Sequence, residues 1–249
     1  MNLLDGDAIL LAGATGRVGG STIATFLREG ARLVVVSRDA ERAKNALDTA
    51  ARGLNRPHVG LPFAADLTDP AQAAAAVAAC VERFGRIDAL VSLAGDGRVV
   101  PLAEATLADL RANVVAFTET AFNLTIPALR AMLSGPARDG ARSRGRIVMV
   151  TAGSSVQPAP GRGLFGIAKA GVNVLMQAVA REHKADGIVA NALVLGGVAT
   201  DAARSYLDAD SFAAAATPQE VADALAFLAS DRGSGVNGAL VDLNARETD

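Results

Sequence analysis

Short apolar runs of strand length alternate along the chain with longer segments of helical periodicity. The runs lack an alternation of apolar and polar positions, which is typical of strands covered on both faces. Strands that alternate with helices predict crossover units and a parallel sheet between two helical layers. The predicted strands are residues 8–11, 33–36, 61–65, 89–93, 147–150, 188–195 and, more weakly, 239–241.

Local signals mark the starts of two predicted helices. Asp39 is placed to cap a helix over 40–52, and Pro70 opens an Ala-rich helix that runs to residue 84. The other predicted helices are 21–28, 107–133, 166–184 and 217–230. We find no internal repeat and no linker. The sequence therefore predicts a single α/β domain over residues 1–249, with a doubly wound parallel sheet of about seven strands.

Composition narrows the range of partners. The chain has 249 residues, a formal net charge of −2 and 51% hydrophobic residues. This charge gives no electrostatic argument for a nucleic acid or an anionic membrane as partner. The apolar runs are too short to span a bilayer, and the first residues lack the features of a secretory signal. With one cysteine, Cys80, expected to be a buried and inert thiol, a cytoplasmic protein is predicted.

One segment is unusually rich in arginine. Residues 134–146 also contain Gly, Pro and Ser, which predicts an exposed loop. We expect its arginines to form a solvated face, the alternative being a binding patch. They are Arg138, Arg142, Arg144 and Arg146.

A glycine-rich turn follows the first predicted strand. Gly13, Gly16 and Gly19 are spaced three residues apart. Such glycines let the backbone approach a pyrophosphate, and the free N–H groups of the following helix favour an anion. A dinucleotide site is the favoured interpretation, and a turn needed only for packing is the alternative. The residues between the glycines that would share this role are Thr15, Arg17 and Val18.

The end of the second strand bears on the choice of dinucleotide. A carboxylate about 20 residues beyond the glycines would bind the ribose 2′-hydroxyl of NAD. Here Ser37 and Arg38 follow the strand, and the Arg38 guanidinium would instead pair with a 2′-phosphate. Arg17 and Arg42 would add positive charge. NADP(H) is therefore favoured over NAD(H), the alternative for Arg38 being an ordinary surface arginine.

The chain resembles the short-chain dehydrogenase/reductase family over nearly its full length. Besides the glycine turn, the matching segments are 65–69, 92–95, 111–114, 145–150, 165–169, 191–200 and 217–222. The resemblance implies a Rossmann-type fold, oxidoreductase activity on a small-molecule substrate, and a homodimer or homotetramer formed through the two long helices. It departs from the family in carrying Leu195 where a proline precedes the glycine turn.

The resemblance also assigns cofactor contacts. Asp66 would bind the adenine amino group, with help from the Leu67 backbone. Lys169 would bind the nicotinamide ribose. The remaining positions are Ala94 and Gly95 after the fourth strand, and Val198 and Thr200, which would contact the nicotinamide amide.

The catalytic half departs from the family pattern. In the family, a Tyr passes the proton, a Ser holds the carbonyl oxygen, a Lys lowers the Tyr pKa and an Asn anchors a water. Asn113 and Lys169 match, but Phe165 stands at the Tyr position and Ala152 at the Ser position. A phenylalanine has no titratable proton, so the ordinary ketone reduction would be strongly impaired.

Two hydroxyl groups are candidates to replace the missing ones. Ser154 would serve if the loop path differs, the alternative being a serine that bonds its own turn. Tyr206 is the only tyrosine and falls in the segment 200–217, where the family places its substrate loop. It would either swing into the site or pack over it. No residues have metal-ligand spacing, so no metal is expected.

Three functions remain open from the sequence. The first is an NADP(H)-dependent oxidoreductase that acts on a small carbonyl, alcohol or activated alkene with nonstandard proton delivery. The second is a catalytically inactive dinucleotide-binding scaffold or sensor. The third is a non-redox enzyme, such as a dehydratase or isomerase, in the same pocket.

Overall fold

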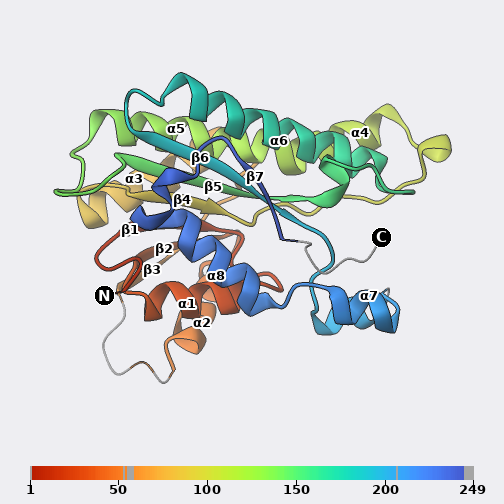
Figure 1. The fold of residues 1–249 in the computed structure, drawn as a ribbon, viewed down its shortest axis with the longest axis horizontal. Coiled ribbons are helices and arrows are strands. Elements are labelled where there is room, and N and C mark those ends of the chain that lie inside the picture. Colours follow the sequence, from red (N-terminus) through yellow and green to blue (C-terminus); the bar gives the residue numbers. More distant parts are fainter. Residues whose placement is uncertain (1, 53, 55–58, 206, 244–249) are drawn as a thin grey trace.

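The computed structural model describes residues 2–52, 54, 59–205 and 207–243. Its centre is a seven-stranded parallel sheet in the order β3-β2-β1-β4-β5-β6-β7 (Figure 1). The strand order reverses between β1 and β4, and ligands of such sheets bind outside the carboxyl ends of the strands at this point. The strands are β1 (Ala8–Ala12), β2 (Arg32–Ser37), β3 (Val59–Ala64), β4 (Ala89–Ser92), β5 (Gly145–Ala152), β6 (Ile188–Leu195) and β7 (Leu240–Asp242).

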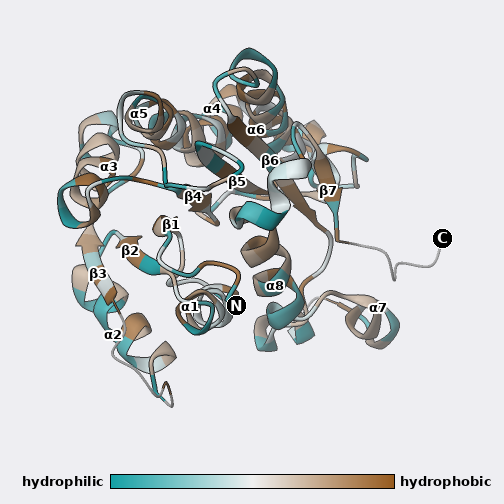
Figure 2. Ribbon diagram, turned by 60° about the vertical axis from the view of Figure 1, so that its left-hand side comes forward, coloured by the Kyte–Doolittle hydropathy of each residue, from teal (hydrophilic) through white to brown (hydrophobic). Residues whose placement is uncertain are grey.

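Helices cover both faces of the sheet. One layer consists of α1 (Gly19–Arg28), α2 (Ala40–Ala50) and α8 (Pro218–Ala229), and the other of α3 (Pro70–Phe84), α4 (Leu107–Val114), α5 (Thr120–Ser134) and α6 (Gly163–Glu182). Successive residues of β1 enter the two cores in turn, which explains its unbroken apolar run. Figure 2 shows the strands in predominantly hydrophobic colours between the two layers. The predicted fold class is confirmed.

The helix starts follow their predicted capping residues. Asp39 accepts hydrogen bonds from the N–H groups of Glu41 and Arg42 at the start of α2. Asp69 caps α3 in the same way, with Pro70 as the first helical residue. A short helix, α7 (Ala209–Ala214), projects from the body and was not predicted, because its segment lacks a periodic apolar face.

The segment predicted as one helix over 107–133 contains a change of helical type. A π-helical turn, η2 (Val115–Glu119), lies between α4 and α5. Such a turn adds a residue to one helical turn and so shifts the phase of the side chains that follow. The prediction of a regular helix was therefore wrong at this point, and the shift affects Phe117 within the turn.

Helix α6 is long and apolar enough to be compared with a membrane-spanning helix, which the sequence did not predict. By length and composition alone it is the one described helix that could cross a membrane, although Lys169 lies within its apolar run. Half of its apolar window is buried inside the protein, and the core helix of a soluble protein meets the same criterion. It is weak support for a membrane span.

Of the four arginines predicted to form a solvated face, Arg142 is exposed, whereas the other three are engaged by the protein. Arg146 lies in β5, is 2% exposed and pairs with Asp7 at 3.1 Å and Asp231 at 3.7 Å. Arg138 donates to Asp7 at 2.6 Å, and Arg144 donates to three carbonyl oxygens at the end of α5. The prediction was wrong for Arg138 and Arg146 because their partner carboxylates are remote in sequence, and for Arg144 because it bonds to the end of α5. We call this group, Asp7, Arg138, Arg146 and Asp231, the amino-edge ion cluster.

Candidate functional site

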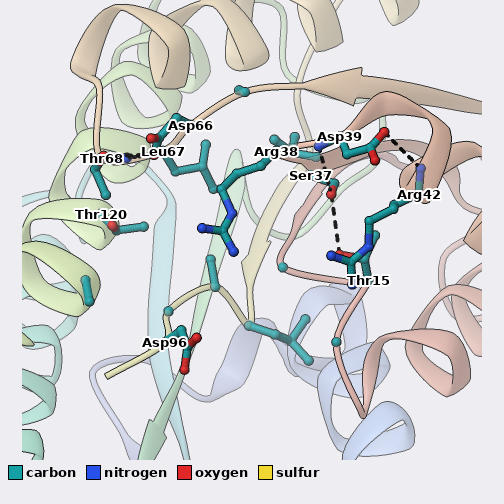
Figure 3. Close-up of a pocket in the computed structure, with 18 residues that line it drawn as sticks. Thr15, Ser37, Arg38, Asp39, Arg42, Asp66, Leu67, Thr68, Asp96 and Thr120 are labelled. Atoms are coloured by element: carbon teal, nitrogen blue, oxygen red, sulfur yellow. Dashed lines mark hydrogen bonds between the residues drawn. The ribbon is translucent and has the colours of Figure 1, made fainter. Parts of the chain in front are cut away.

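A cavity of about 360 Å³ opens at the carboxyl ends of β1, β2 and β4 (Figure 3). Its position at the reversal of strand order is the one expected for a ligand of a doubly wound sheet. The turns after these strands, the loop after β3 and the π-helical turn contribute its walls. The predicted cofactor-binding residues that line it are Gly13, Thr15, Gly16, Ser37, Arg38, Asp66, Leu67, Ala94 and Gly95.

The three glycines of the turn have different structural roles. Gly13 has φ +75°, and a side chain there would collide with the backbone of Ala94. A side chain at Gly19 would collide with the backbone of Ala14. Gly16 is exposed, lines the cavity and meets only a backbone oxygen at 3.4 Å. Packing of the chain itself therefore requires Gly13 and Gly19, and Gly16 leaves room for an approaching ligand.

The turn offers free backbone donors at the start of α1. Within the described residues, no hydrogen-bond partner is found for the N–H groups of Thr15, Arg17 and Val18. Val18 is the residue before the first helical turn, so the helix dipole adds to these donors. The Arg17 side chain is exposed and does not line the cavity. A phosphate at this turn would therefore be bound by backbone N–H groups and not by the Arg17 side chain.

Positive charge gathers at the outer end of the cavity. Arg38 extends from the end of β2 into the cavity, and Arg42 of α2 lines the same wall (Figure 3). The Asp39 carboxylate between them is engaged in capping α2. Ser37 and Thr15 place their hydroxyl oxygens 3.4 Å apart beside Arg38. Two guanidinium groups and two hydroxyls therefore face a common space.

Asp66 lies on the opposite wall, after β3. Its Oδ1 accepts hydrogen bonds from the Thr68 N–H at 3.0 Å and the Thr68 hydroxyl at 2.8 Å. These bonds, with a smaller contribution from the nearby Arg38 charge, hold the pKa of the Asp66 carboxyl below its ordinary value. Leu67 beside it is buried in the core. Asp66 is thus a fixed, ionised acceptor on the cavity wall.

A second group of predicted residues lies deeper, around Lys169 of α6. The Lys169 side chain is 7% exposed, and its Nζ donates to the Val150 carbonyl oxygen at 2.8 Å. Nζ also lies 4.4 Å from the ring centroid of Phe117. Burial lowers the pKa of the Lys169 amine to about 8. The Phe165 ring meets the Phe117 ring edge to face, with centroids 4.9 Å apart.

Asn113 is fully buried at the end of α4. Its Nδ2 donates to the Asp109 carbonyl oxygen at 3.0 Å, while its Oδ1 has no partner among the described residues. A side chain at Gly97 would strike both this Oδ1 and the Phe117 ring, which places the two side by side. We call Asn113, Phe117, Phe165 and Lys169 the inner cluster.

The two serines after β5 differ in their bonding. Ser155 donates to the Ala152 carbonyl oxygen of its own turn at 2.5 Å and accepts from Asn173 Nδ2 at 2.9 Å. The Ser154 hydroxyl is buried and has no partner in the described part of the chain. Ser154 is therefore the uncommitted hydroxyl, and Ser155 is the serine that stabilises the turn.

The structure divides the predicted site residues into two sets. The outer set lines the cavity. The predicted residues that do not line it are Arg17, Val18 and Gly19 of the glycine turn, and Asn113, Ser154, Phe165, Lys169, Val198 and Thr200. Val198 pairs with Ala216 in a backbone bridge, and the Thr200 N–H bonds to the Val198 carbonyl oxygen. Tyr206 lies outside the described residues. Within the described ranges, no group of three or more His, Cys, Asp or Glu side chains is placed to hold a metal.

Sequence reasoning missed Phe117. It lies four residues after Asn113, so a regular helix would have placed it on the same face. That spacing was available in the sequence. Its contact with both Phe165 and Lys169, however, depends on the packing of η2 against α6.

Comparison with known proteins identifies the family. The family model for short chain dehydrogenases matches residues 7–211. The chain belongs to the short-chain dehydrogenase/reductase family. It is accordingly an oxidoreductase of the short-chain type, from a family that binds nicotinamide dinucleotides.

Similar proteins align with this chain along nearly its whole length. Oxidoreductase UcpA of Escherichia coli K12 is 31% identical over 255 residues, covering 96% of this chain and 93% of that protein. The 3-oxoacyl-[acyl-carrier-protein] reductase FabG of Thermotoga maritima is 28% identical, with 97% of each chain covered. Among solved structures, a short-chain oxidoreductase of Pseudomonas aeruginosa PAO1 is described as containing an atypical catalytic center. It superimposes with a TM-score of 0.84 over 97% of each chain. At 24% sequence identity, this similarity shows the fold alone.

Proposed function

We propose that this protein is an NADP(H)-dependent oxidoreductase that acts on a small carbonyl, alcohol or activated alkene without a proton donor at position 165. The observation that carries the proposal is the Arg38 guanidinium inside the cavity at the end of β2, with Arg42 beside it. A planar guanidinium matches the oxygens of a phosphate on the ribose. The carboxylate that follows Arg38 in the chain, Asp39, caps α2.

The residues present fit the dinucleotide. Gly16 leaves room for a pyrophosphate at the free N–H groups of the turn, and Asp66 offers an ionised acceptor to the adenine amino group. Ala94 and Gly95 form the wall that continues toward the inner cluster. The bound cofactor would supply or accept a hydride. Lys169 would donate to ribose hydroxyls, and Val198 and Thr200 would contact the nicotinamide amide.

The proton would come from a group other than residue 165. Loss of a positioned donor typically costs about 10²–10⁴-fold in rate. An activated alkene tolerates this loss best, because hydride addition leaves a delocalised anion that water can protonate. Two uncommitted groups belong to the predicted catalytic residues: Asn113 Oδ1 would accept a hydrogen bond from such a water, and the Ser154 hydroxyl would donate to the substrate oxygen.

The cofactor assignment is tested by fluorescence titration with NADPH and NADH. We expect NADH to bind at least about tenfold more weakly, a difference of 1.4 kcal/mol. Equal affinities, or no binding of either cofactor, would reject the assignment. An oxidation assay on the bound NADPH, with a panel of enones and small ketones, then tests turnover.

A second function is supported by a specific observation. Phe165 and Ala152 remove both hydroxyls of the family mechanism, and the Phe165 ring is packed against Phe117 rather than left facing a polar group. A dinucleotide-binding scaffold or sensor would show tight NADPH binding and no oxidation on any panel. A non-redox enzyme would convert its substrate with the cofactor unchanged.

We also propose a cytoplasmic homodimer or homotetramer. Large apolar side chains are exposed on the two long helical segments, and the predicted assembly would cover them. They are Leu107, Phe122, Ile167 and Val174, each more than half exposed. Light scattering coupled to size-exclusion chromatography would give the assembly mass, and a monomer would reject this part of the proposal.

A further inference from the structure

Phe117 separates the cavity from Lys169. Gly95 and Ala116 line the cavity, whereas Lys169 does not. The Phe117 side chain is 4% exposed, lies directly against Gly95, and carries Lys169 Nζ 4.4 Å from its ring centroid. The ring therefore stands between the wall of the cavity and the buried amine.

The polar groups behind the ring have unused hydrogen-bonding capacity among the described residues. An ammonium group has three donors, and the one hydrogen bond described for Lys169 Nζ goes to the Val150 carbonyl oxygen. Asn113 Oδ1 is buried beside the ring without a partner among the described residues. Buried polar groups are almost always hydrogen-bonded, so a donor and an acceptor left together point to a polar partner that arrives from outside.

Three features surround the Phe117 ring. Its backbone lies in the π-helical turn η2, a feature that recurs at functional sites. The ring fills the space that a side chain at Gly95 or Gly97 would need, so both glycines are required for the ring to lie where it does. Its aromatic neighbour, Phe165, contacts it edge to face, and such a contact holds a ring by weak forces.

We propose that Phe117 is a gate that sets how strongly the second half of a dinucleotide binds. The adenosine half occupies the existing cavity, and the second ribose reaches Lys169 and Asn113 when the Phe117 ring turns aside. Turning the ring breaks its contacts with Lys169 and Phe165, which offsets part of the hydrogen bonding gained. The second half of the ligand then adds little net affinity. This inference rests on the proposed dinucleotide function.

The test compares the affinity for the whole dinucleotide with the affinity for its adenosine half. Dissociation constants for NADP⁺ and for adenosine 2′,5′-bisphosphate are measured by calorimetry on the wild type and on Phe117→Leu and Phe117→Ala. The wild type should bind NADP⁺ less than about tenfold more tightly than the bisphosphate, a difference below 1.4 kcal/mol. Both variants should raise the NADP⁺ affinity about tenfold and leave the bisphosphate affinity unchanged.

Phe227→Leu is the matched control, because Phe227 lies on α8, does not line the cavity and is 42% exposed. It should change neither affinity. Phe117→Leu keeps an apolar side chain in the core if the alanine variant fails to fold. A crystal structure of the NADP⁺ complex gives a direct readout, in which the ring is displaced and Lys169 contacts the second ribose.

The outcomes separate the gate from the proposed function. If the wild type binds neither ligand, the dinucleotide function fails and the gate fails with it. If both ligands bind but the Phe117 variants leave their ratio unchanged, the gate alone is rejected. A complex in which the ribose contacts Lys169 while the ring keeps its present position would also reject the gate.

Discussion

The outer part of the cavity and the inner cluster occupy the same edge of the sheet, yet their polar groups are arranged differently. In the outer part, Arg38 faces a common space with hydroxyls, and the Asp39 and Asp66 carboxylates have hydrogen-bond partners. In the inner cluster, Asn113 Oδ1 is unpartnered among the described residues and two phenyl rings fill the space around Lys169. The phenylalanine that stands at the family's tyrosine position, Phe165, is thus packed against a second aromatic ring, Phe117.

The largest expected effect comes from restoring hydroxyls to the inner cluster. The double variant Phe165→Tyr/Ala152→Ser should raise carbonyl reduction by about 10²–10⁴-fold, because a positioned phenol near Lys169 supplies the proton. The measurement is NADPH oxidation on a panel of ketones and aldehydes. Absence of any gain while NADPH still binds would show that the inner region no longer forms a reductase pocket.

The pH dependence of stability should report the burial of Lys169. Its pKa is about 8 in the folded protein and 10.5 ordinarily, so the unfolded chain binds more protons between these values. The contribution of Lys169 to the free energy of unfolding is therefore most favourable above pH 10.5, where the amine is neutral in both states. This contribution is lost as the pH falls toward 8. The total change is on the order of 3 kcal/mol.

Urea unfolding of the wild type and Lys169→Met across this range would measure the effect. The difference in free energy of unfolding, wild type minus variant, should rise with pH. Subtracting the variant removes the contributions of other lysines. A difference that stays flat would mean that the amine titrates normally and that the inner cluster is open to water.

On the outer side, Arg38→Ala should weaken NADPH binding by about 2 kcal/mol, roughly 30-fold, because a charge-assisted pair with the phosphate is lost. NADH affinity should change little, since it lacks that phosphate. Arg142→Ala is a control at an exposed arginine outside the cavity. An equal loss for both cofactors would place Arg38 in a structural role and weaken the contrast between the two regions.

The smallest effect concerns the turn behind Phe165. Ser155→Ala removes its hydrogen bonds to Ala152 and Asn173, which should lower the free energy of unfolding by about 1 kcal/mol. Ser154→Ala should cost less, because its hydroxyl has no partner within the described chain. Thermal unfolding of the two variants would compare them. The reverse order would mean that Ser154 is the serine that holds the turn.

The features that could be predicted from the sequence are those set by residues close together in the chain. Apolar runs, helix caps and the glycine turn each act within a few residues, so the strands, most helices and the outer wall with Arg38 were predictable. The contacts of Phe117 with Phe165 and Lys169 were not, because they depend on how the π-helical turn packs against a helix remote in sequence. The burial of Arg146 was also missed, since Asp7 and Asp231 lie far from it along the chain.

The amino-edge ion cluster has a consequence for biosynthesis. Asp7 emerges from the ribosome early, Arg138 and Arg146 beyond the middle of the chain, and Asp231 near its end. A nascent chain that has translated only β1 to β4 would hold the Asp7 carboxylate without its guanidinium partners. The carboxylate of Asp7 is therefore left without its two closest cationic partners until β5 has been made, so the ion cluster can stabilise the amino edge of the sheet only late in synthesis.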